Sequence, residues 1–320
     1  MKEVAEKIQK MGVVPVVVLN DAKDAAPLAK ALCEGGLPCA EVTFRTDAAE
    51  ESIRIMTKEY PDMFVGAGTV LTIDRVNRAV DAGAKFIVSP GFDPEIVDYC
   101  LEKEIPVFPG CITPSEAAQA VKRGLKIVKF FPAEQFGGVS TIKALAAPYV
   151  GLKFMPTGGV NAKNLESYLS CDKIIACGGS WMVNKDMMKN GDFDGIKKLT
   201  QQAVDTMLGF EMKHIGINAK DEADADGIAS ALNKMFGFEK KVGNSSIFAG
   251  TGFEVMKKPY LGANGHVAIQ TNYINRAIYH LEKRGFEFDM DTAKYDAKGN
   301  MKAVYFKGEF GGFALHLVQK

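Results

Sequence analysis

The chain has 320 residues, of which 47% are hydrophobic and 24% are charged, and its 39 Lys and Arg residues are balanced by 39 Asp and Glu residues. This composition is typical of a globular protein of about two domains, and the charge balance argues against partners such as nucleic acid or anionic membranes and favours small molecules. The start, Met-Lys-Glu-Val-Ala-Glu-Lys, has no long apolar run, so we expect neither a signal peptide nor a membrane span and predict a cytoplasmic protein.

Up to about residue 210, short apolar runs alternate with amphipathic stretches of helical period, which is typical of repeated strand-helix units around a parallel sheet. Strands are predicted at 13–19, 40–45, 64–70, 86–89, 106–109, 127–131, 153–157 and 173–176. Helices are predicted at 22–34, 48–58, 72–82, 94–103, 113–123, 140–147, 164–170 and, closing the domain, 192–210. Eight such units predict an α/β fold of the TIM-barrel type, (β/α)8, over residues 1–212. The competing architecture is an open doubly wound sheet, which often has a Gly-x-Gly-x-x-Gly turn where this chain has Leu-Asn-Asp-Ala at 19–22.

The strand predicted at 40–45 carries Glu41, Thr43 and Arg45 near its carboxyl end. Residues two apart on a strand point to the same face, and the carboxyl ends of barrel strands form the active-site face. Two interpretations stay open: Glu41 and Arg45 form a packed ion pair that adds little stability, or both have functional roles, which we favour.

Lys129 lies in Ile-Val-Lys-Phe-Phe-Pro-Ala, a predicted strand that is apolar on both sides. If Lys129 points inward, desolvation and a neighbouring cation such as Arg45 would lower its pKa and provide the neutral amine that attacks a ketone. The alternative is a lysine whose stem lies along apolar surface while its ammonium group reaches water. We favour a catalytic lysine, because lysines are rarely buried without a partner or a task.

Glycines follow three of the predicted strands, at 66–69 (Gly-Ala-Gly-Thr), 157–159 (Thr-Gly-Gly) and 178–180 (Gly-Gly-Ser). The first run would let a ligand approach the backbone next to the hydroxyl group of Thr69. The other two follow the seventh and eighth strands, where barrels commonly bind phosphate through backbone amides. Glycine pairs are also ordinary tight turns, but their position after these two strands favours a phosphate site.

Histidines are absent before position 214, so the predicted barrel cannot use imidazole as a base or metal ligand, and we expect no metal in its site. The six cysteines include no Cys-x-x-Cys pair, so neither a zinc site nor a disulfide framework is indicated there, and we expect reduced, mostly buried thiols.

A second domain is predicted at 213–320. The runs His-Ile-Gly-Ile-Asn-Ala at 214–219 and His-Val-Ala-Ile-Gln-Thr at 266–271 each precede a helical pattern, at 223–235 and 274–283, and then short alternating strands. This predicts an α+β domain of two tandem βαβββ modules.

Five motifs of the first domain resemble the bacterial 2-keto-3-deoxy-6-phosphogluconate and 4-hydroxy-2-oxoglutarate aldolases: Glu41-Val-Thr-Phe-Arg45, Gly66-Ala-Gly-Thr69, Lys129-Phe-Phe-Pro-Ala-Glu134, Pro156-Thr-Gly-Gly159 and Gly178-Gly-Ser-Trp181. The resemblance covers about residues 1–210. It implies a homotrimeric class I aldolase without a cofactor, which cleaves a keto acid, phosphorylated or not, to pyruvate and an aldehyde. The products would be pyruvate with glyceraldehyde 3-phosphate, or pyruvate with glyoxylate.

The resemblance also implies a role for each matching residue. Lys129 forms the Schiff base and Glu41 shuttles protons, while Arg45 and Thr69 hold the pyruvyl carboxylate. The distal phosphate is held at the two glycine turns and Thr157 lies near the hydroxyl-bearing carbon, so the remaining substrate-binding residues are Thr157, Gly158, Gly159, Gly179 and Ser180. A protonated imine is an electron sink for carbon-carbon cleavage, whereas a metal-dependent aldolase would need ligands, usually histidines.

Residues 213–320 resemble, in topology, the vicinal oxygen chelate superfamily, which includes glyoxalases and bleomycin-resistance proteins. The resemblance implies a divalent metal at His214, Glu254, His266 and His316, although that superfamily more often has glutamate where His316 stands. By ligand type the ion would be zinc, iron, nickel or manganese. The alternative is a metal-free binding or assembly module in which these histidines pack locally.

Two other functions stay open at this stage. The barrel could be a non-catalytic phosphosugar-binding protein, with chemistry or sensing in the second domain. It could also be an epimerase or isomerase of the ribulose-phosphate type, which explains Lys129 less well because its proton transfer requires no imine.

Overall fold

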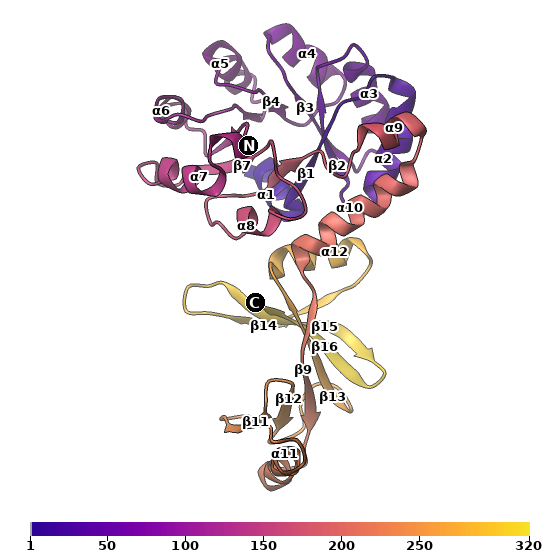
Figure 1. The fold of residues 1–320 in the computed structure, drawn as a ribbon, viewed down its shortest axis with the longest axis vertical. Helices are drawn as coiled ribbons and strands as arrows, with labels where there is room; N and C mark the ends of the chain where they lie inside the picture. The colour runs from indigo at the N-terminus through magenta and orange to yellow at the C-terminus, as the bar shows by residue number, and fades with distance from the viewer. Residues whose placement is uncertain (1) are drawn as a thin grey trace. The chain divides into compact units, whose positions relative to one another are not determined.

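The structure, a computed structural model, describes residues 2–320. These residues form two compact units, one up to Met207 and the other from Leu208 to Lys320. The division falls at the end of helix α10 (Phe193–Leu208), which is the closing helix expected at 192–210. Each unit is a separate fold with its own sheet (Figure 1).

The first unit contains eight short strands: β1 (Val13–Val17), β2 (Cys39–Thr43), β3 (Phe64–Gly68), β4 (Ile87–Val88), β5 (Val107–Phe108), β6 (Ile127–Phe130), β7 (Lys153–Pro156) and β8 (Cys177–Gly179). Six of them pair in the order β5-β4-β3-β2-β1-β8, and β6 pairs with β7, all in parallel. Isolated bridges join Gly110 to Lys129 and Thr157 to Gly178, which link the two groups of strands. The result is a curled parallel sheet whose carboxyl ends gather the side chains discussed below.

Helices connect these strands and surround the curled sheet (Figure 1). They are α1 (Lys2–Met11), α2 (Ala25–Glu34), α3 (Ala49–Glu59), α4 (Ile73–Asp81), α5 (Pro94–Glu102), α6 (Pro114–Lys122), α7 (Gly138–Ala146), α8 (Leu165–Leu169), α9 (Lys185–Asn190) and α10. Their starts follow the local sequence. At α6, for example, Thr113 and Glu116 form a capping box and Pro114 occupies the first turn, where its missing N–H costs no hydrogen bond.

The prediction of the eighth strand at 173–176 is wrong by a few residues. Ile174 makes only an isolated bridge with Phe154, whereas Cys177–Gly179 pairs with β1, with Val13 opposite Cys177. The apolar residues at 173–176 are buried but do not form the strand that pairs with β1: Ile174 and Ile175 are 5% and 6% exposed. The glycines of the true strand carry no hydrophobic signal, and for this reason the pattern missed it.

The second unit has the element order β9 (Glu211–Asn218), α11 (Glu222–Phe236), β10 (Lys240–Val242), β11 (Ser246–Ala249), β12 (Phe253–Met256), β13 (Gly265–Thr271), α12 (Ile274–Lys283), β14 (Phe288–Tyr295), β15 (Met301–Phe310) and β16 (Phe313–Gln319). Its strands form one mixed sheet in the order β10-β11-β12-β9-β13-β16-β15-β14. The central pair β9 and β13 is antiparallel, and each has a parallel neighbour, β12 and β16 respectively.

Helix α11 packs on this sheet through small residues. Ala225 and Ala229 lie against Ile247 and Val255 in a buried cluster, which leaves little side-chain volume between helix and sheet.

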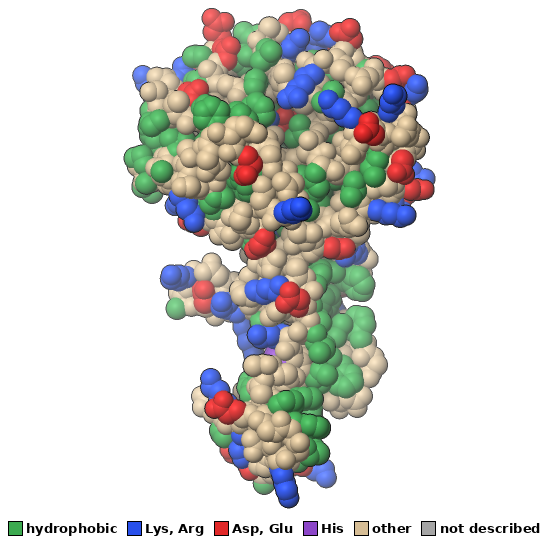
Figure 2. Space-filling model, viewed as in Figure 1, with side chains coloured by type: hydrophobic (Ala, Val, Ile, Leu, Met, Phe, Trp, Pro, Cys, Tyr) green, Lys and Arg blue, Asp and Glu red, His purple; other side chains and the backbone are tan. Residues whose placement is uncertain are grey.

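The surface agrees with the balanced composition. Acidic and basic side chains are interspersed over the face of the first unit shown in Figure 2, and hydrophobic side chains gather along one side of the second unit. No helix within residues 2–320 is both long enough and apolar enough to cross a bilayer.

Candidate active site and candidate metal centre

Lys129 on β6 and Glu41 in the middle of β2 form a buried ion pair. The Lys129 Nζ donates to Glu41 Oε1 at 2.9 Å, and the two residues are 5% and 0% exposed. The ammonium group of Lys129 therefore does not reach out to water. The second carboxylate oxygen of Glu41, Oε2, is buried and has no partner within residues 2–320. Buried charges are costly unless they are fully satisfied, so an acceptor left open beside an amine indicates a site that receives a ligand.

The glycines of β3 make room for this pair. A Cβ on Gly68 would lie closer than 3 Å to the side chain of Glu41, and a Cβ on Gly66 would lie equally close to the ring of Phe86. The interpretation that these glycines admit a ligand to the backbone is therefore corrected, because the space beside them is filled by protein side chains.

Arg45 and Thr69 lie together at the ends of β2 and β3. The Arg45 Nε donates to Thr69 Oγ1 at 3.1 Å, and Thr69 has φ of +54°. Arg45 is exposed, and within residues 2–320 the ion pair of Glu41 is made with Lys129. The alternative of a packed Glu41–Arg45 ion pair is therefore wrong, and the guanidinium group is available for an anionic ligand.

A cavity of about 540 Å³ opens at the ends of β7 and β8. Six of the nine residues predicted from the sequence line it: Arg45, Thr157, Gly158, Gly159, Gly179 and Ser180. Phe131 also lines the cavity, and its ring centre lies 5.4 Å from Lys129 Nζ, which places the amine next to the cavity wall. The Oγ1 of Thr157 is buried without a partner in the described chain.

The loops around this cavity are held in conformations that favour glycine. Gly158 and Gly159 have φ of +98° and +83°, and a Cβ on Gly159 would lie closer than 3 Å to the Glu134 side chain. The Glu134 carboxylate accepts a short hydrogen bond from Tyr168, and the Glu134 amide donates to the carbonyl of Gly158. The backbone N–H groups of Gly159 and Ser180 donate to no protein acceptor in residues 2–320, so they can bind an anion.

Three polar cavity residues were missed by sequence reasoning. Asn184, Lys185 and Asp186 line the cavity from the start of α9, a helix that was not predicted. The helix has six residues, too few for an apolar periodicity to stand out. The Asn184–Lys185 pair itself would have been the only signal, because Asn is a preferred N-cap residue.

In the second unit, four residues from four strands converge. The Nε2 atoms of His214 and His266 are 3.1 Å apart, and Glu254 Oε2 lies 3.0 Å from the first and 3.3 Å from the second. One ring nitrogen of His316 lies within 4.8 Å of both, and neither nitrogen of its ring has a partner in the described residues.

The surroundings of this cluster orient its side chains. Ser246 Oγ donates to Glu254 Oε1 at 2.7 Å, and the ring of Tyr305 stacks on His316 with centroids 4.5 Å apart. Burial, then the neighbouring His266 and His214, lowers the pKa of His316 to about 3, so its imidazole is neutral at physiological pH. Burial raises the pKa of Glu254, but hydrogen bonds from His214, His266 and Ser246 outweigh it and hold this pKa below its ordinary value. Imidazole nitrogens and a carboxylate are a donor set that suits a divalent transition metal.

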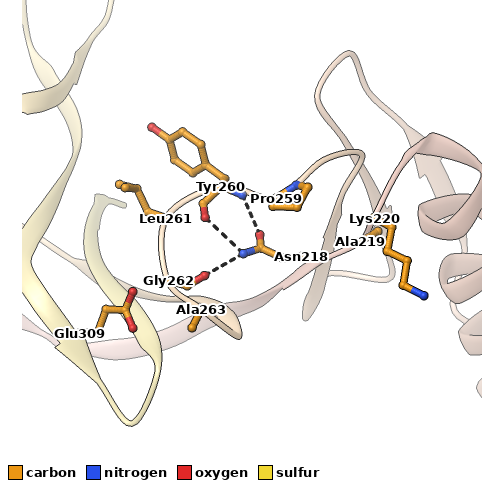
Figure 3. Close-up of a pocket in the computed structure, with 9 residues that line it drawn as sticks. All are labelled: Asn218, Ala219, Lys220, Pro259, Tyr260, Leu261, Gly262, Ala263 and Glu309. Carbon is orange, nitrogen blue, oxygen red and sulfur yellow. Dashed lines mark hydrogen bonds between the residues drawn. The ribbon is translucent and has the colours of Figure 1, made fainter.

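A second cavity, of about 500 Å³, lies beside the loop between β12 and β13 (Figure 3). The Asn218 side chain donates to the carbonyls of Tyr260 and Gly262 and accepts from the Tyr260 amide, while Lys220 points away from the loop. The amide of Asn218 is thus fully used in holding the loop. The ring centroids of Tyr260 and Tyr305 are 6.0 Å apart, and Tyr305 stacks on His316, so the loop contacts the surroundings of the histidine cluster.

Comparison with known proteins gives consistent results for the first unit. The family model described as "KDPG and KHG aldolase" matches residues 4–199. A 2-dehydro-3-deoxy-phosphogluconate aldolase from Treponema pallidum is 45% identical over 204 residues, which are 64% of this chain and 97% of that protein. A KHG/KDPG aldolase from Escherichia coli is 43% identical over 205 residues, 64% of this chain and 96% of that protein.

Solved structures give the same result. A KDPG aldolase from Legionella pneumophila, with pyruvate captured as a covalent carbinolamine intermediate, has a TM-score of 0.61 and 37% identity and covers 62% of this chain and 97% of its own. A 2-keto-3-deoxy-6-phosphogluconate aldolase from Zymomonas mobilis with 3-phosphoglycerate has a TM-score of 0.58 and 37% identity, covering 62% and 94%. The family model ends at residue 199, before the second unit begins.

Proposed function

This chain belongs to the KDPG and KHG aldolase family, and on that premise we propose that its first unit cleaves 2-dehydro-3-deoxy-6-phosphogluconate, 4-hydroxy-2-oxoglutarate, or both. The class of the enzyme is that of a lyase, a class I aldolase that forms a Schiff base with pyruvate. The buried contact between Lys129 and Glu41 is the observation that carries the proposal for this chain's own residues.

The geometry supports a mechanism in which the two side chains exchange protons. Glu41 takes a proton from the Lys129 ammonium, and the free amine attacks the C2 carbonyl to give a carbinolamine. Loss of water, to which Glu41 donates the proton, leaves a protonated imine. Glu41, again a carboxylate, then takes the proton of the C4 hydroxyl as the C3–C4 bond breaks, the aldehyde leaves, and the bonding electrons move into the imine to form an enamine. Glu41 returns this proton to C3 of the enamine, and hydrolysis of the resulting imine by water releases pyruvate and restores Lys129.

The cavity supports the placement of the substrate. The Arg45 guanidinium, oriented by Thr69, would bind the carboxylate, because a planar cation forms paired hydrogen bonds with it. The partnerless Thr157 hydroxyl would contact the C4 hydroxyl. The amides around Gly158, Gly159, Gly179 and Ser180 would bind the distal phosphate, and the 3-phosphoglycerate of the Zymomonas mobilis structure supports a phosphorylated substrate.

Borohydride reduction in the presence of pyruvate tests the proposal. We expect a stable adduct on the Lys129 peptide in the wild type and none in Lys129→Met, while Lys153→Met, a lysine on the neighbouring strand β7, keeps both the adduct and aldol cleavage. An adduct on another lysine, or cleavage without any trapped imine, would overturn the assignment. Binding of the phosphosugar without cleavage would favour the non-catalytic alternative.

Three further expectations remain part of this proposal. We propose that the curled sheet is a closed (β/α)8 barrel, supported by the two bridges that join its strand groups. We also propose a homotrimer, supported by the family resemblance, and a cytoplasmic location, supported by the metabolic role of the relatives.

For the second unit we propose a vicinal-oxygen-chelate-like domain of two βαβββ modules that binds a divalent metal through His214, Glu254, His266 and His316. The convergence of these four side chains favours this over a metal-free module. The metal would act as a Lewis acid, and the protein would supply the three imidazoles and the carboxylate that hold it.

Metal analysis tests the second proposal. Purified full-length protein should contain about one divalent ion per chain, and His266→Ala should lose it. His280→Ala is the matched control, because this fourth histidine lies on α12, outside the cluster. Equal metal content in the three proteins would exclude the site.

A further inference from the structure

We propose that Lys185 is a specificity-determining residue that selects phosphorylated over unphosphorylated substrate, by placing a cation at the phosphate end of the cavity. The inference rests on the proposed aldolase function and extends it to a residue outside the family motifs quoted above. It combines three observations: the position of Lys185, its freedom from protein partners and the unpaired amides that line the same cavity.

The position of Lys185 is set by the turn after β8. Val183 donates to the Ser180 carbonyl, which folds the chain back over the end of the strand, and Asn184 then caps α9 by accepting from the Asp186 and Met187 amides. Lys185 is the first residue of α9 and lines the cavity that Gly159 and Ser180 also line.

The ammonium group of Lys185 has no ion pair or hydrogen bond within residues 2–320. By contrast, Lys197 pairs with Glu34 at 2.7 Å and Lys129 pairs with Glu41 at 2.9 Å. Lys185 is exposed, so its long flexible side chain can move toward a ligand at little cost in desolvation.

The charged side chains that line the cavity favour a second anion site beside Lys185. The cations lining the cavity are Arg45 and Lys185, and the anion lining it is Asp186. Arg45 is oriented by Thr69 for the substrate carboxylate, which leaves Lys185 for a second anionic group. Backbone amides such as those of Gly159 and Ser180 bind a phosphate through partial charges, and a phosphate dianion beside them gains further from a full positive charge. Consecutive residues on a helix point about 100° apart, so Asp186 and Lys185 do not face the same point.

Steady-state cleavage of the two substrates by the full chain is the first experiment. Lys185→Gln should raise KM for 2-dehydro-3-deoxy-6-phosphogluconate by about three- to tenfold, as expected for a partly exposed charge pair, and leave kcat and the kinetics with 4-hydroxy-2-oxoglutarate unchanged. Lys185→Arg should keep the wild-type KM. The matched control is Lys189→Gln, a lysine of the same helix that does not line the cavity. The effect of Lys185→Gln should shrink as salt is raised, because the charge is exposed.

Calorimetric binding of 3-phosphoglycerate and of glycerate gives a readout that does not depend on turnover. Lys185→Gln should weaken binding of the first ligand only. Equal effects on both ligands or both substrates, or no effect on either, would overturn the role of Lys185 even with full aldolase activity. If the wild-type protein shows neither cleavage nor a trapped imine, the proposed function is refuted. The effect of Lys185→Gln on the binding of 3-phosphoglycerate, compared with its effect on glycerate, would still decide whether Lys185 contacts the phosphate.

Discussion

Lys129 Nζ and Glu41 Oε1 are 2.9 Å apart although their residues are 88 positions apart in the chain. The contact joins strand β6 to strand β2, inside the curled sheet, and it gives the amine a proton acceptor within direct reach. Proton transfer between the two residues requires no intervening water, which is suited to a sequence of steps that repeatedly moves one proton.

Replacement of the carboxylate should separate binding from chemistry. Glu41→Gln keeps the size of the side chain and removes its basicity, so kcat should fall by about a hundred- to ten-thousandfold while the KM for substrate changes little. Rates of pyruvate release, measured beside the yield of the borohydride adduct, check this. Wild-type turnover in the variant would remove Glu41 from the mechanism.

The ion pair between Lys129 and Glu41 should also affect the free energy of unfolding. Lys129→Met leaves the Glu41 carboxylate buried without its cation and should lower the free energy of unfolding by about 3–5 kcal/mol. The double variant Lys129→Met/Glu41→Gln should recover most of that loss, because no buried charge remains. Urea unfolding of Lys129→Met, Glu41→Gln and the double variant measures the difference, and a loss in the double variant equal to the sum of the two single losses would contradict this prediction.

The space beside Glu41 gives a steric prediction. Gly68→Ala should displace the carboxylate, because the new Cβ would overlap it, and should reduce kcat by at least about tenfold. Gly91→Ala is the control, since a Cβ there meets no atom within 4 Å. Equal activities of the two variants would show that Glu41 does not occupy the position described.

The cysteines should be unreactive in the folded protein. Burial raises the pKa of Cys33 to about 11 and of Cys100 and Cys111 to about 12, so at pH 8 these thiols are almost fully protonated. Iodoacetamide at pH 8 should therefore label these three cysteines only after denaturation. Because the folded state disfavours the thiolate, their contribution to stability is complete below pH 9, the ordinary pKa, and declines as the pH rises toward 12. Rapid labelling of native protein would contradict the burial.

Ser246 should support the proposed metal centre without touching the ion. Its hydroxyl group donates a hydrogen bond to Glu254 Oε1, the carboxylate oxygen that does not face the histidines, and so orients the carboxylate. Ser246→Ala should therefore weaken metal binding by about ten- to a hundredfold. Competition with a chromophoric chelator measures the affinity. Ser230→Ala, a serine on α11 that bonds Asp226, serves as the control and should bind metal as the wild type does.

Sequence patterns predicted the parts of this protein that rest on local chemistry. The inward placement of Lys129 followed from a charged residue in an apolar run, and its burial confirms that reading. The strands β4 and β5 have two residues each, yet their apolar runs located them. The resemblance of the second domain implies a shared site for His214, His266 and His316, and ring nitrogens of these three histidines lie within 4.8 Å of one another.

The remaining features depend on contacts that no local pattern contains. The sequence places both Glu41 and Arg45 near Lys129, but it does not say which of them contacts the amine. In the structure the ion pair is made with Glu41, whereas Arg45 bonds Thr69. The sequence predicts that Gly66 and Gly68 leave the backbone open to a ligand, whereas in the structure the side chains of Phe86 and Glu41 fill that space. Lys185 was overlooked because a short helix brings it to a cavity built by distant turns.

The long separation between Glu41 and Lys129 also has a consequence for biosynthesis. A nascent chain that has emerged only as far as β5 contains the acid but lacks the amine, and a chain in which β6 has not yet docked carries Lys129 without its carboxylate partner. Lys129 and Glu41 can act together on a ketone only after β6 has packed beside the strands that carry Glu41. Borohydride trapping of the imine can therefore also be used to measure how much of the protein has completed folding.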